Sequence, residues 1–265
     1  MLEALKPIVI PPALRSARPT LAGARLGTSS LLSREEREAL EHASSMGRAV
    51  RCGSDLVNEE EVPDRVFIIL EGWGCRYHTS RDGRRQISGF LVPGDTANID
   101  VLGLAKGGYG IRALTEMRVL VIPRDRALAL AAAHTGIAST FLFIALSDAA
   151  MHRQWTFCIG RLSARQRLAH VLCELSARLG REESNQSQFQ LPVTQEVFAD
   201  ALGLTSVHVN RTMRQLHKDG LISKSNRAVR IPDVRSLRNV GEFDPSYLNF
   251  HAPDWTRTAA FIPQA

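Results

Sequence analysis

This chain of 265 residues has few cysteines and no long apolar run. The four cysteines are scattered, at Cys52, Cys75, Cys158 and Cys173, which argues against a disulfide framework and is typical of a reducing compartment. No apolar run approaches the roughly 18 residues of a membrane helix. Four prolines interrupt residues 1–19, so residues 1–25 are expected to be a loosely ordered extension rather than a signal peptide. We expect a cytoplasmic protein without membrane contact.

Basic charge is concentrated in one segment of the chain. The sequence has 33 Lys and Arg against 27 Asp and Glu, a formal charge of +6. Between residues 205 and 231 one acid, Asp219, stands against the basic residues Arg211, Arg214, Lys218, Lys224, Arg227 and Arg230. Such a concentration is typical of a surface that binds an anionic polymer.

Glycine-containing turns divide the first half of the chain. A helix is expected at Ser33–Ala43, because Ser33 is a good cap and acids follow it. Turn dipeptides then recur every eleven residues, at Glu71-Gly72, Asp82-Gly83 and Pro93-Gly94. They separate segments rich in β-branched and aromatic residues: VFIIL, WGCRYHTS and RRQISGFLV, with IRALTEMRVLVI further on. Short strands with regular turns predict an antiparallel sandwich or barrel.

A heptad-like pattern follows Pro123. Apolar residues recur at steps of four and three, with Asp148 filling one gap, at Ile137, Phe141, Ile144, Met151, Trp155 and Cys158. This period suits a helix packed along a partner helix, and it suits equally a helix lying on its own domain. A hinge at 161–163, a second helix at Ala164–Leu179 and a loose polar stretch at 181–188 are expected next.

Residues 194–222 have the helix-turn-helix pattern. Thr194 is a helix cap, Ala199 lets two helices approach closely, and Gly203 permits the positive φ of a tight turn. Val209, Met213 and Leu216 are expected to face inward. The segment LISKSNRAVRI then predicts a β-hairpin with a basic tip, a wing.

The opposite face of the second helix is the predicted DNA-reading surface. Arg211 is the expected base reader, because arginine bonded to guanine is the commonest specific contact, and a phosphate contact is the alternative. Ser206 and Asn210 would support it, and Arg214 and Lys218 would meet phosphates. The remaining expected DNA-binding residues are Thr194, Gln195, Thr205, Val207, His208, Lys224 and Arg227.

Together these features resemble the Crp/Fnr family of bacterial transcription regulators over about residues 26–245. The resemblance is most specific in TQEVFADALGLTSVHVNRTMRQLHKDGLI, and is also visible in FIILEGW, DGRRQISGFLVPGD and RALTEMRVLVIPR. It implies an α+β fold: an antiparallel β-roll over 26–134, a dimerisation helix over 135–160, a winged helix-turn-helix over 161–240 and a tail over 241–265. It also implies a homodimer on a palindromic double-stranded DNA operator, with RNA polymerase as a partner if the protein is an activator. The dimer seam would then be Ile137, Phe141, Ile144, Asp148, Met151 and Trp155.

The chain departs from the cofactor-binding members of that family. Cyclic-AMP binders carry Gly-Glu-Leu and Arg-Ser/Thr-Ala segments, whereas this chain has TANIDVLGLAKGGYGIRAL, and Arg112 falls on the next strand. Iron–sulfur members cluster cysteines near the N-terminus, whereas this chain has none before Cys52. Cys75 and His78 would point to opposite faces of a strand, which disfavours a haem or metal site. We expect no cyclic AMP, haem, iron–sulfur cluster or metal.

The reading helix also departs from the family at one position. Relatives often have Glu where this chain has Val207, followed here by His208. A valine cannot accept a hydrogen bond from cytosine, although it can contact a thymine methyl group. The half-site therefore cannot be carried over from the family.

Two other functions are weighed against a regulator. A cupin-like metal enzyme would need a His-x-His pair, but His42, His78 and His134 stand far apart, so no enzyme is expected. A nucleic-acid-binding structural protein without effector response is the other alternative. Footprinting would distinguish it, because it would protect no discrete palindrome.

Overall fold

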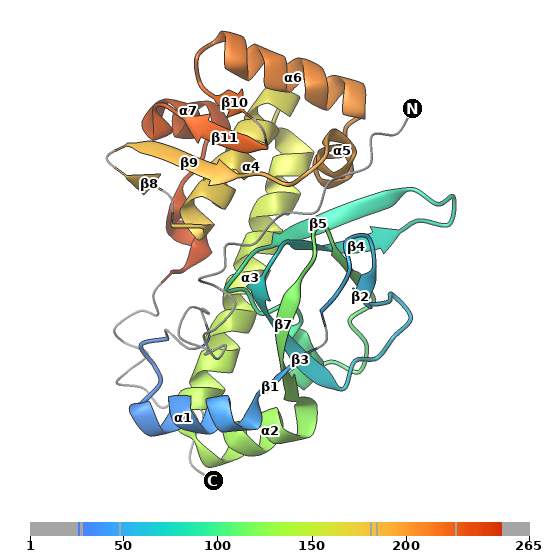
Figure 1. The fold of residues 1–265 in the computed structure, drawn as a ribbon, viewed down its shortest axis with the longest axis vertical. Coiled ribbons are helices and arrows are strands. Elements are labelled where there is room, and N and C mark those ends of the chain that lie inside the picture. Colours follow the sequence, from blue (N-terminus) through green and yellow to red (C-terminus); the bar gives the residue numbers. More distant parts are fainter. Residues whose placement is uncertain are drawn as a thin grey trace.

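A computed structural model describes residues 29–250 and Leu26, apart from positions 48, 181, 184 and 226. The expected extension over 1–25 and the end of the expected tail, 251–265, lie outside the described residues. Figure 1 shows a β-roll beside one long helix, with a smaller unit of helices and strands at the far end of that helix. We call this unit, residues 164–250, the head. The α+β fold class is confirmed, and no helix in the described part is long and apolar enough to cross a membrane.

The roll consists of two antiparallel sheets, with strand orders β1-β7-β3 and β2-β6-β4-β5. Its strands are β1 Ser45–Met46, β2 Asp55–Val57, β3 Arg65–Glu71, β4 Gly74–Thr79, β5 Arg85–Leu91, β6 Gly110–Ala113 and β7 Arg118–Pro123, with a 3₁₀ helix, η3 Ile99–Leu102, between β5 and β6. Gly72 turns β3 into β4 with φ +83°, where a Cβ atom would lie 2.1 Å from the carbonyl oxygen of Glu116. This turn requires glycine both for its backbone angle and for space.

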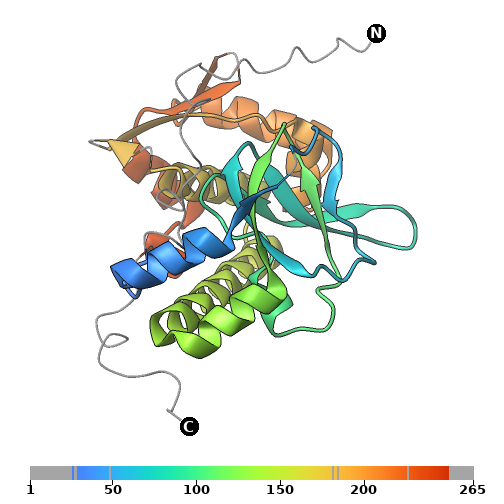
Figure 2. The same ribbon diagram turned by 60° about the horizontal axis from the view of Figure 1, so that its bottom comes forward.

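Helices close one end of the roll. The first, α1 Arg34–Ala43, begins as expected with a capping box between Ser33 and Glu36. The Glu36 carboxylate also accepts a hydrogen bond from Gly136 N, at 2.9 Å. This bond ties α1 to the start of the long helix, α3 Thr135–Arg161. In the chain, α2 Arg124–Ala133 precedes α3, and the three helices lie side by side in Figure 2.

The head follows a short break after α3. Ser163 caps α4 Ala164–Arg178, which precedes the remaining elements: β8 Glu182–Glu183, β9 Gln186–Gln190, α5 Gln195–Leu202, α6 Ser206–Lys218, β10 Ser223–Ser225, β11 Ala228–Ile231, α7 Val234–Gly241 and η4 Pro245–Leu248. The expectation of a loose stretch over 181–188 is wrong for its described part. Ser187 and Phe189 alternate inward and pair with β11, so a polar-looking segment forms the middle of a sheet of order β10-β11-β9-β8.

One hydrophobic cluster crosses from the roll to the head. Roll residues such as Ile87 and Phe90 belong to the same buried cluster as Phe198 and Leu202 of α5. The Phe90 ring lies edge-on to both Phe198 and Trp155, at 5.8 Å between ring centroids in each case. The head is therefore packed against the roll rather than attached by its linker alone.

Candidate nucleic-acid interface

Two capped helices and a glycine form the expected helix-turn-helix. The Thr194 hydroxyl accepts a hydrogen bond from Val197 N and starts α5, and the Thr205 hydroxyl accepts one from His208 N and starts α6. Between them Gly203 has φ +63° and ψ +42°. A Cβ atom at Gly203 would meet nothing closer than 3.8 Å, so the left-handed backbone is the reason for glycine here.

The inward face of α6 differs at one position from the prediction. Val209 and Leu216 are fully buried, as expected, but Met213 is half-buried and Thr212 is buried beside it. The Thr212 hydroxyl donates to the carbonyl oxygen of His208 at 2.9 Å. A threonine can therefore face the core, because the preceding turn of its own helix supplies the acceptor.

The outward face of α6 forms an open hollow at the surface. It is lined by Gln195, Ser206, Val207, Asn210, Arg211, Arg214, Gln215 and Lys218. Seven of these eight were expected from the sequence; the exception is Gln215, which lies between Arg214 and Lys218, one turn after Arg211. Within the described part of the chain Arg211, Arg214 and Lys218 form no ion pair. The hollow is a polar, basic surface whose charges have no ion-pair partner among the described residues.

Hydrogen bonds hold three amide side chains of the hollow. Asn210 donates through Nδ2 to Gln195 Oε1 at 2.9 Å, which joins α6 to the first residue of α5. At the other end of α6, Gln215 donates to Asp219, and Arg165 of α4 forms a 2.7 Å ion pair with the same carboxylate. The one acid of the basic segment is thus neutralised by α4.

Val207 is the most exposed large apolar side chain of the described residues, at 78%. It lies in the first turn of α6, beside Ser206 and one turn before Arg211. His208, its neighbour, is half-buried. A branched apolar side chain is therefore exposed at the N-terminal end of α6, the helix whose polar and basic side chains line the hollow.

The wing is present next to the helix-turn-helix. Strands β10 and β11 pair antiparallel, with Lys224 opposite Val229. Lys224 and Arg227 are both exposed, and Arg227 has φ +74° at the turn. Both basic side chains of the expected wing therefore reach solvent near the hairpin tip.

The six residues expected at a dimer seam all face this chain's own core. Ile137, Phe141 and Ile144 pack with the roll and α2, while Met151 and Trp155 belong to the cluster shared with the head. Asp148 forms a 2.7 Å ion pair with Arg76 of β4. These intramolecular contacts favour the second interpretation of the heptad pattern, a helix lying on its own domain, for this face of α3.

A different face of α3 carries exposed apolar groups. Its residues follow at steps of three and four on the side opposite Ile144, and we call them the exposed face of α3: Leu142, Leu146, Ala149, Arg153 and Phe157. Leu146 is 54% exposed and Phe157 is 45% exposed. α3 has two faces with apolar residues, and the residues that the sequence analysis selected by their spacing lie on the face that packs inward.

Cys75 and His78 differ sharply in exposure. Cys75 is fully buried and His78 is exposed on the same strand, and in the described part of the chain no three His, Cys, Asp or Glu side chains are placed to hold a metal. Burial raises the pKa of the Cys75 thiol to about 12 and that of Cys158 to about 11. Such thiols are protonated at neutral pH and are poor ligands.

Two cavities that adjoin the roll are small. The cavity between β5 and α3 measures about 20 Å³, and one beside Tyr109 about 10 Å³. Arg112 of β6 donates through Nε to the carbonyl oxygen of Gly53 at 2.8 Å and lies near Asp55. Its guanidinium is thus engaged by the roll's own backbone.

Comparisons with known proteins agree with this architecture. Residues 166–240 match a model of the Crp-like helix-turn-helix domain, and residues 48–134 match a model of the cyclic nucleotide-binding domain. The transcriptional activatory protein AadR of Rhodopseudomonas palustris is 30% identical over 200 residues, covering 74% of this chain and 82% of that protein. The nitrogen fixation regulation protein FixK of Azorhizobium caulinodans is 26% identical over 227 residues, covering 85% of this chain and 84% of that protein. The solved structure of FixK2 from Bradyrhizobium japonicum has a TM-score of 0.68 at 23% identity, covering 74% of this chain and 96% of that one.

Proposed function

The chain belongs to the Crp/Fnr family of DNA-binding transcription regulators, and on that premise we propose that it binds a palindromic operator as a homodimer. Each copy places α6 in the major groove of one half-site. The observation that carries this proposal is the hollow on α6, whose arginine and lysine side chains have no partner within the described chain. The DNA major groove, with the phosphates of the two backbones along its edges, supplies those partners.

Roles within the hollow follow from position along α6. Arg211 reads a base, because it projects from the second turn, where a recognition helix lies deepest in the groove. Arg214 and Lys218 lie nearer the C-terminal end and meet phosphates. Asn210 and Gln195 act as a bonded pair, while Ser206, His208 and the capping residues Thr194 and Thr205 complete the contact surface. Lys224 and Arg227 contact the backbone from the wing.

Val207 supplies the apolar element of the readout. A valine that is 78% exposed gains free energy by burying its methyl groups against the C5-methyl group of thymine. A glutamate at this position would instead accept a hydrogen bond from cytosine. We therefore propose that the half-site has thymine where relatives with Glu select cytosine.

The dimer seam is proposed on the exposed face of α3. Homodimers are typical of this family, and a two-fold operator requires them. Leu142, Leu146 and Phe157 are apolar groups that lie exposed on one helical face of the described chain. Their spacing suits a parallel pair of helices, the arrangement in which both heads point the same way along the dimer axis.

We propose that regulation does not use cyclic AMP, haem or an iron–sulfur cluster. Support comes from Arg112, which bonds to the Gly53 carbonyl, and from cavities of about 20 Å³ and 10 Å³. A pocket for a small-molecule ligand normally measures about 300 Å³ or more. We also propose a cytoplasmic regulator without catalytic activity, for which RNA polymerase is a partner at activated genes.

Substitution of Arg211 tests the proposed reading. Selection from a random DNA pool first identifies the half-site, and affinities are then measured on that operator and on unrelated DNA. Arg211→Ala is expected to weaken operator binding by about 1–3 kcal/mol and to leave non-specific binding largely intact.

Lys218→Ala is the matched control, since it removes one positive charge from the same helix. It is expected to weaken binding to both DNAs by the same factor. Equal losses with Arg211→Ala would assign Arg211 to a phosphate instead. Selection that yields no discrete inverted repeat would favour a structural nucleic-acid-binding protein.

A further inference from the structure

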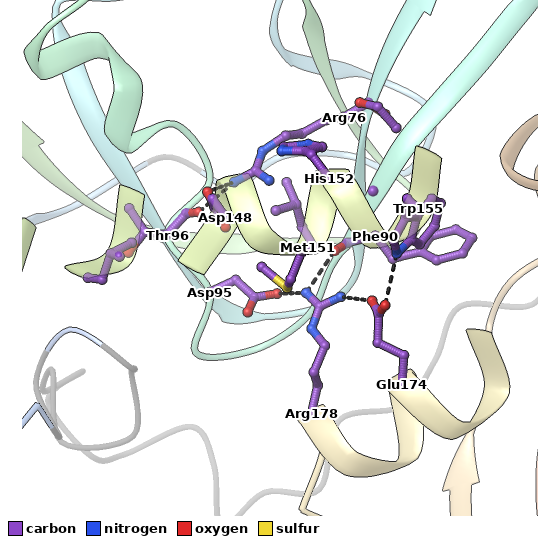
Figure 3. Close-up of a pocket in the computed structure, with 14 residues that line it drawn as sticks. Arg76, Phe90, Asp95, Thr96, Asp148, Met151, His152, Trp155, Glu174 and Arg178 are labelled. Atoms are coloured by element: carbon purple, nitrogen blue, oxygen red, sulfur yellow. Dashed lines mark hydrogen bonds and ion pairs between the residues drawn. The ribbon is translucent and has the colours of Figure 1, made fainter. Parts of the chain in front are cut away.

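Five charged side chains meet where the roll, α3 and the head come together; four of these side chains are buried and that of Asp148 is half-buried. Figure 3 shows them around the small cavity between β5 and α3. Arg76 of β4 pairs with Asp148 of α3 at 2.7 Å. Arg178, from the last turn of α4, pairs with Glu174 of its own helix at 2.9 Å and with Asp95 of the roll at 2.5 Å. The second group joins the head to the roll.

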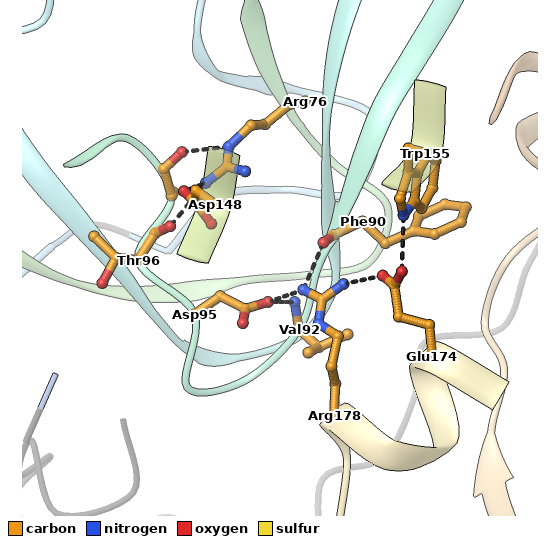
Figure 4. A network of polar contacts seen from close by, with 10 residues as sticks. Arg76, Phe90, Val92, Asp95, Thr96, Asp148, Trp155, Glu174 and Arg178 are labelled. Carbon is orange, nitrogen blue, oxygen red and sulfur yellow. Dashed lines mark hydrogen bonds and ion pairs between the residues drawn. The ribbon is translucent and has the colours of Figure 1, made fainter. Parts of the chain in front are cut away.

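Arg178 touches the roll at two separate atoms. Its Nη2 donates to Asp95 Oδ2 and, at 2.8 Å, to the carbonyl oxygen of Phe90, while its Nη1 donates to Glu174 Oε1 (Figure 4). The side chain is 5% exposed. Burial by itself lowers the pKa of Arg178, but Asp95 and Glu174 outweigh that effect and raise it above its ordinary value. The planar guanidinium thus has one orientation that satisfies all three acceptors.

The carboxylates on both sides are also held in place. Asp95 Oδ2 accepts a hydrogen bond from Val92 N at 2.7 Å. Glu174 Oε2 accepts one from Trp155 Nε1 at 2.8 Å and one from the Tyr247 hydroxyl at 2.7 Å. A displacement of the head relative to the roll would break several charge-assisted bonds in a buried site, where each is costly to lose.

This anchoring matters because the covalent link between α3 and the head is short. α3 ends at Arg161 and α4 begins at Ala164. The two linker residues between them do not by themselves set a unique orientation of the head. The dimer seam fixes the position of α3 relative to the partner's α3. The contacts between the head and the roll then fix the position of α6 in the dimer. One added base pair moves a half-site by about 3.4 Å and turns it by about 35°. The orientation of the head therefore decides which half-site spacing fits.

We propose that Arg178 is a positioning residue that sets the half-site spacing this regulator accepts, by clamping each head against its roll through Asp95 and the Phe90 carbonyl. The inference rests on the proposed dimeric DNA binding. Arg178 is more than 20 residues before the reading helix, and its side chain is buried at the junction. Its role is to restrict the positions that the two α6 helices of the dimer can take relative to each other.

The test uses the full-length dimer and a series of duplexes. Each duplex carries the two selected half-sites at the preferred spacing, or with one base pair more or less. The wild type is expected to prefer its own spacing by about an order of magnitude, the loss typical of one wrong base pair. Asp95→Asn, which keeps the side-chain shape but removes the charge, is expected to reduce that preference to about threefold, with binding to a single half-site unchanged.

Asp148→Asn is the matched control. It breaks the neighbouring buried pair with Arg76, which joins the roll to α3 and not to the head, and it is expected to keep the wild-type preference. If Asp95→Asn does not fold, Asp95→Asn combined with Arg178→Gln replaces it. This double variant removes both of the charges that face each other across the junction. Unfolding curves and sedimentation show which variants remain folded dimers.

A folded Asp95→Asn or double-variant dimer that keeps the wild-type spacing preference would overturn the proposal. So would an equal change at every spacing, in either direction. Failure of the wild type to bind any paired half-sites would instead overturn the proposed function.

Discussion

The reading surface of α6 and the junction below the head use the same residue types in opposite ways. On α6, Arg211 and Arg214 are exposed and have no partner within the described chain. At the junction, Arg178 is buried between two carboxylates and a carbonyl oxygen. Exposed charge costs little until a partner arrives, whereas buried charge is tolerated only when its partners are already in place. The first arrangement is suited to recognition and the second to fixing geometry.

Removing a buried arginine of the junction and an exposed, paired arginine of the roll should give very different losses of stability. Arg178→Ala leaves Asp95 and Glu174 buried beside an empty site, and we expect the free energy of unfolding to fall by about 3–5 kcal/mol. Arg84→Ala breaks an exposed pair with Asp82 and should change it by no measurable amount. Urea unfolding at one fixed protein concentration measures both. Similar losses would show that burial does not distinguish the two kinds of arginine.

The two faces of α3 extend the comparison from charge to apolar groups. Leu146→Glu on the exposed face should leave the fold intact and weaken the dimer about a hundredfold or more, because a two-fold interface loses the leucine twice. Ile144→Asp, two residues earlier, places a charge in the chain's own core and should unfold the protein instead. Sedimentation with circular dichroism separates the outcomes. A folded monomer from Ile144→Asp would return the seam to the inward face.

The smallest expected effect concerns the one apolar group of the reading surface. Replacing single thymines of the half-site by deoxyuridine removes only the C5-methyl group. We expect one position to lose about fourfold in affinity with the wild type, the contribution of one buried methyl group. With Val207→Ala, replacing the same thymine by deoxyuridine should reduce the affinity by a smaller factor. Equal sensitivity in both proteins would mean that Val207 does not contact that methyl group.

Local chemistry made the reading surface predictable from the sequence. Thr194, Gly203 and Thr205 act through neighbours within a few residues, so capping and turn preferences identify α5 and α6 without knowledge of the fold. The turn glycines of the roll are recognisable for the same reason. Whether the surface residues of α6 contact DNA as proposed is a separate matter, tested by the substitutions above.

The junction was not predictable, because its partners are distant in sequence. Arg178 and Asp95 are 83 residues apart, and neither stands in a recognisable motif. Asp148 was expected at a dimer seam because periodicity reports spacing along a helix and not what the face meets. Strand β9 was missed because Ser187, a buried polar residue, finds its partner in the Ser176 hydroxyl, which no pattern of apolar residues reveals.

The ring of Phe90 has a consequence for the modularity of this chain. It belongs to the roll, yet it completes the core around Phe198 of the head and Trp155 of α3. A head excised at the α3–α4 break would leave Phe198 without this neighbour and expose apolar surface that is now covered. Exchange of heads between relatives is therefore not a matter of joining segments at the linker. A chimaera must carry a compatible β5 together with its head.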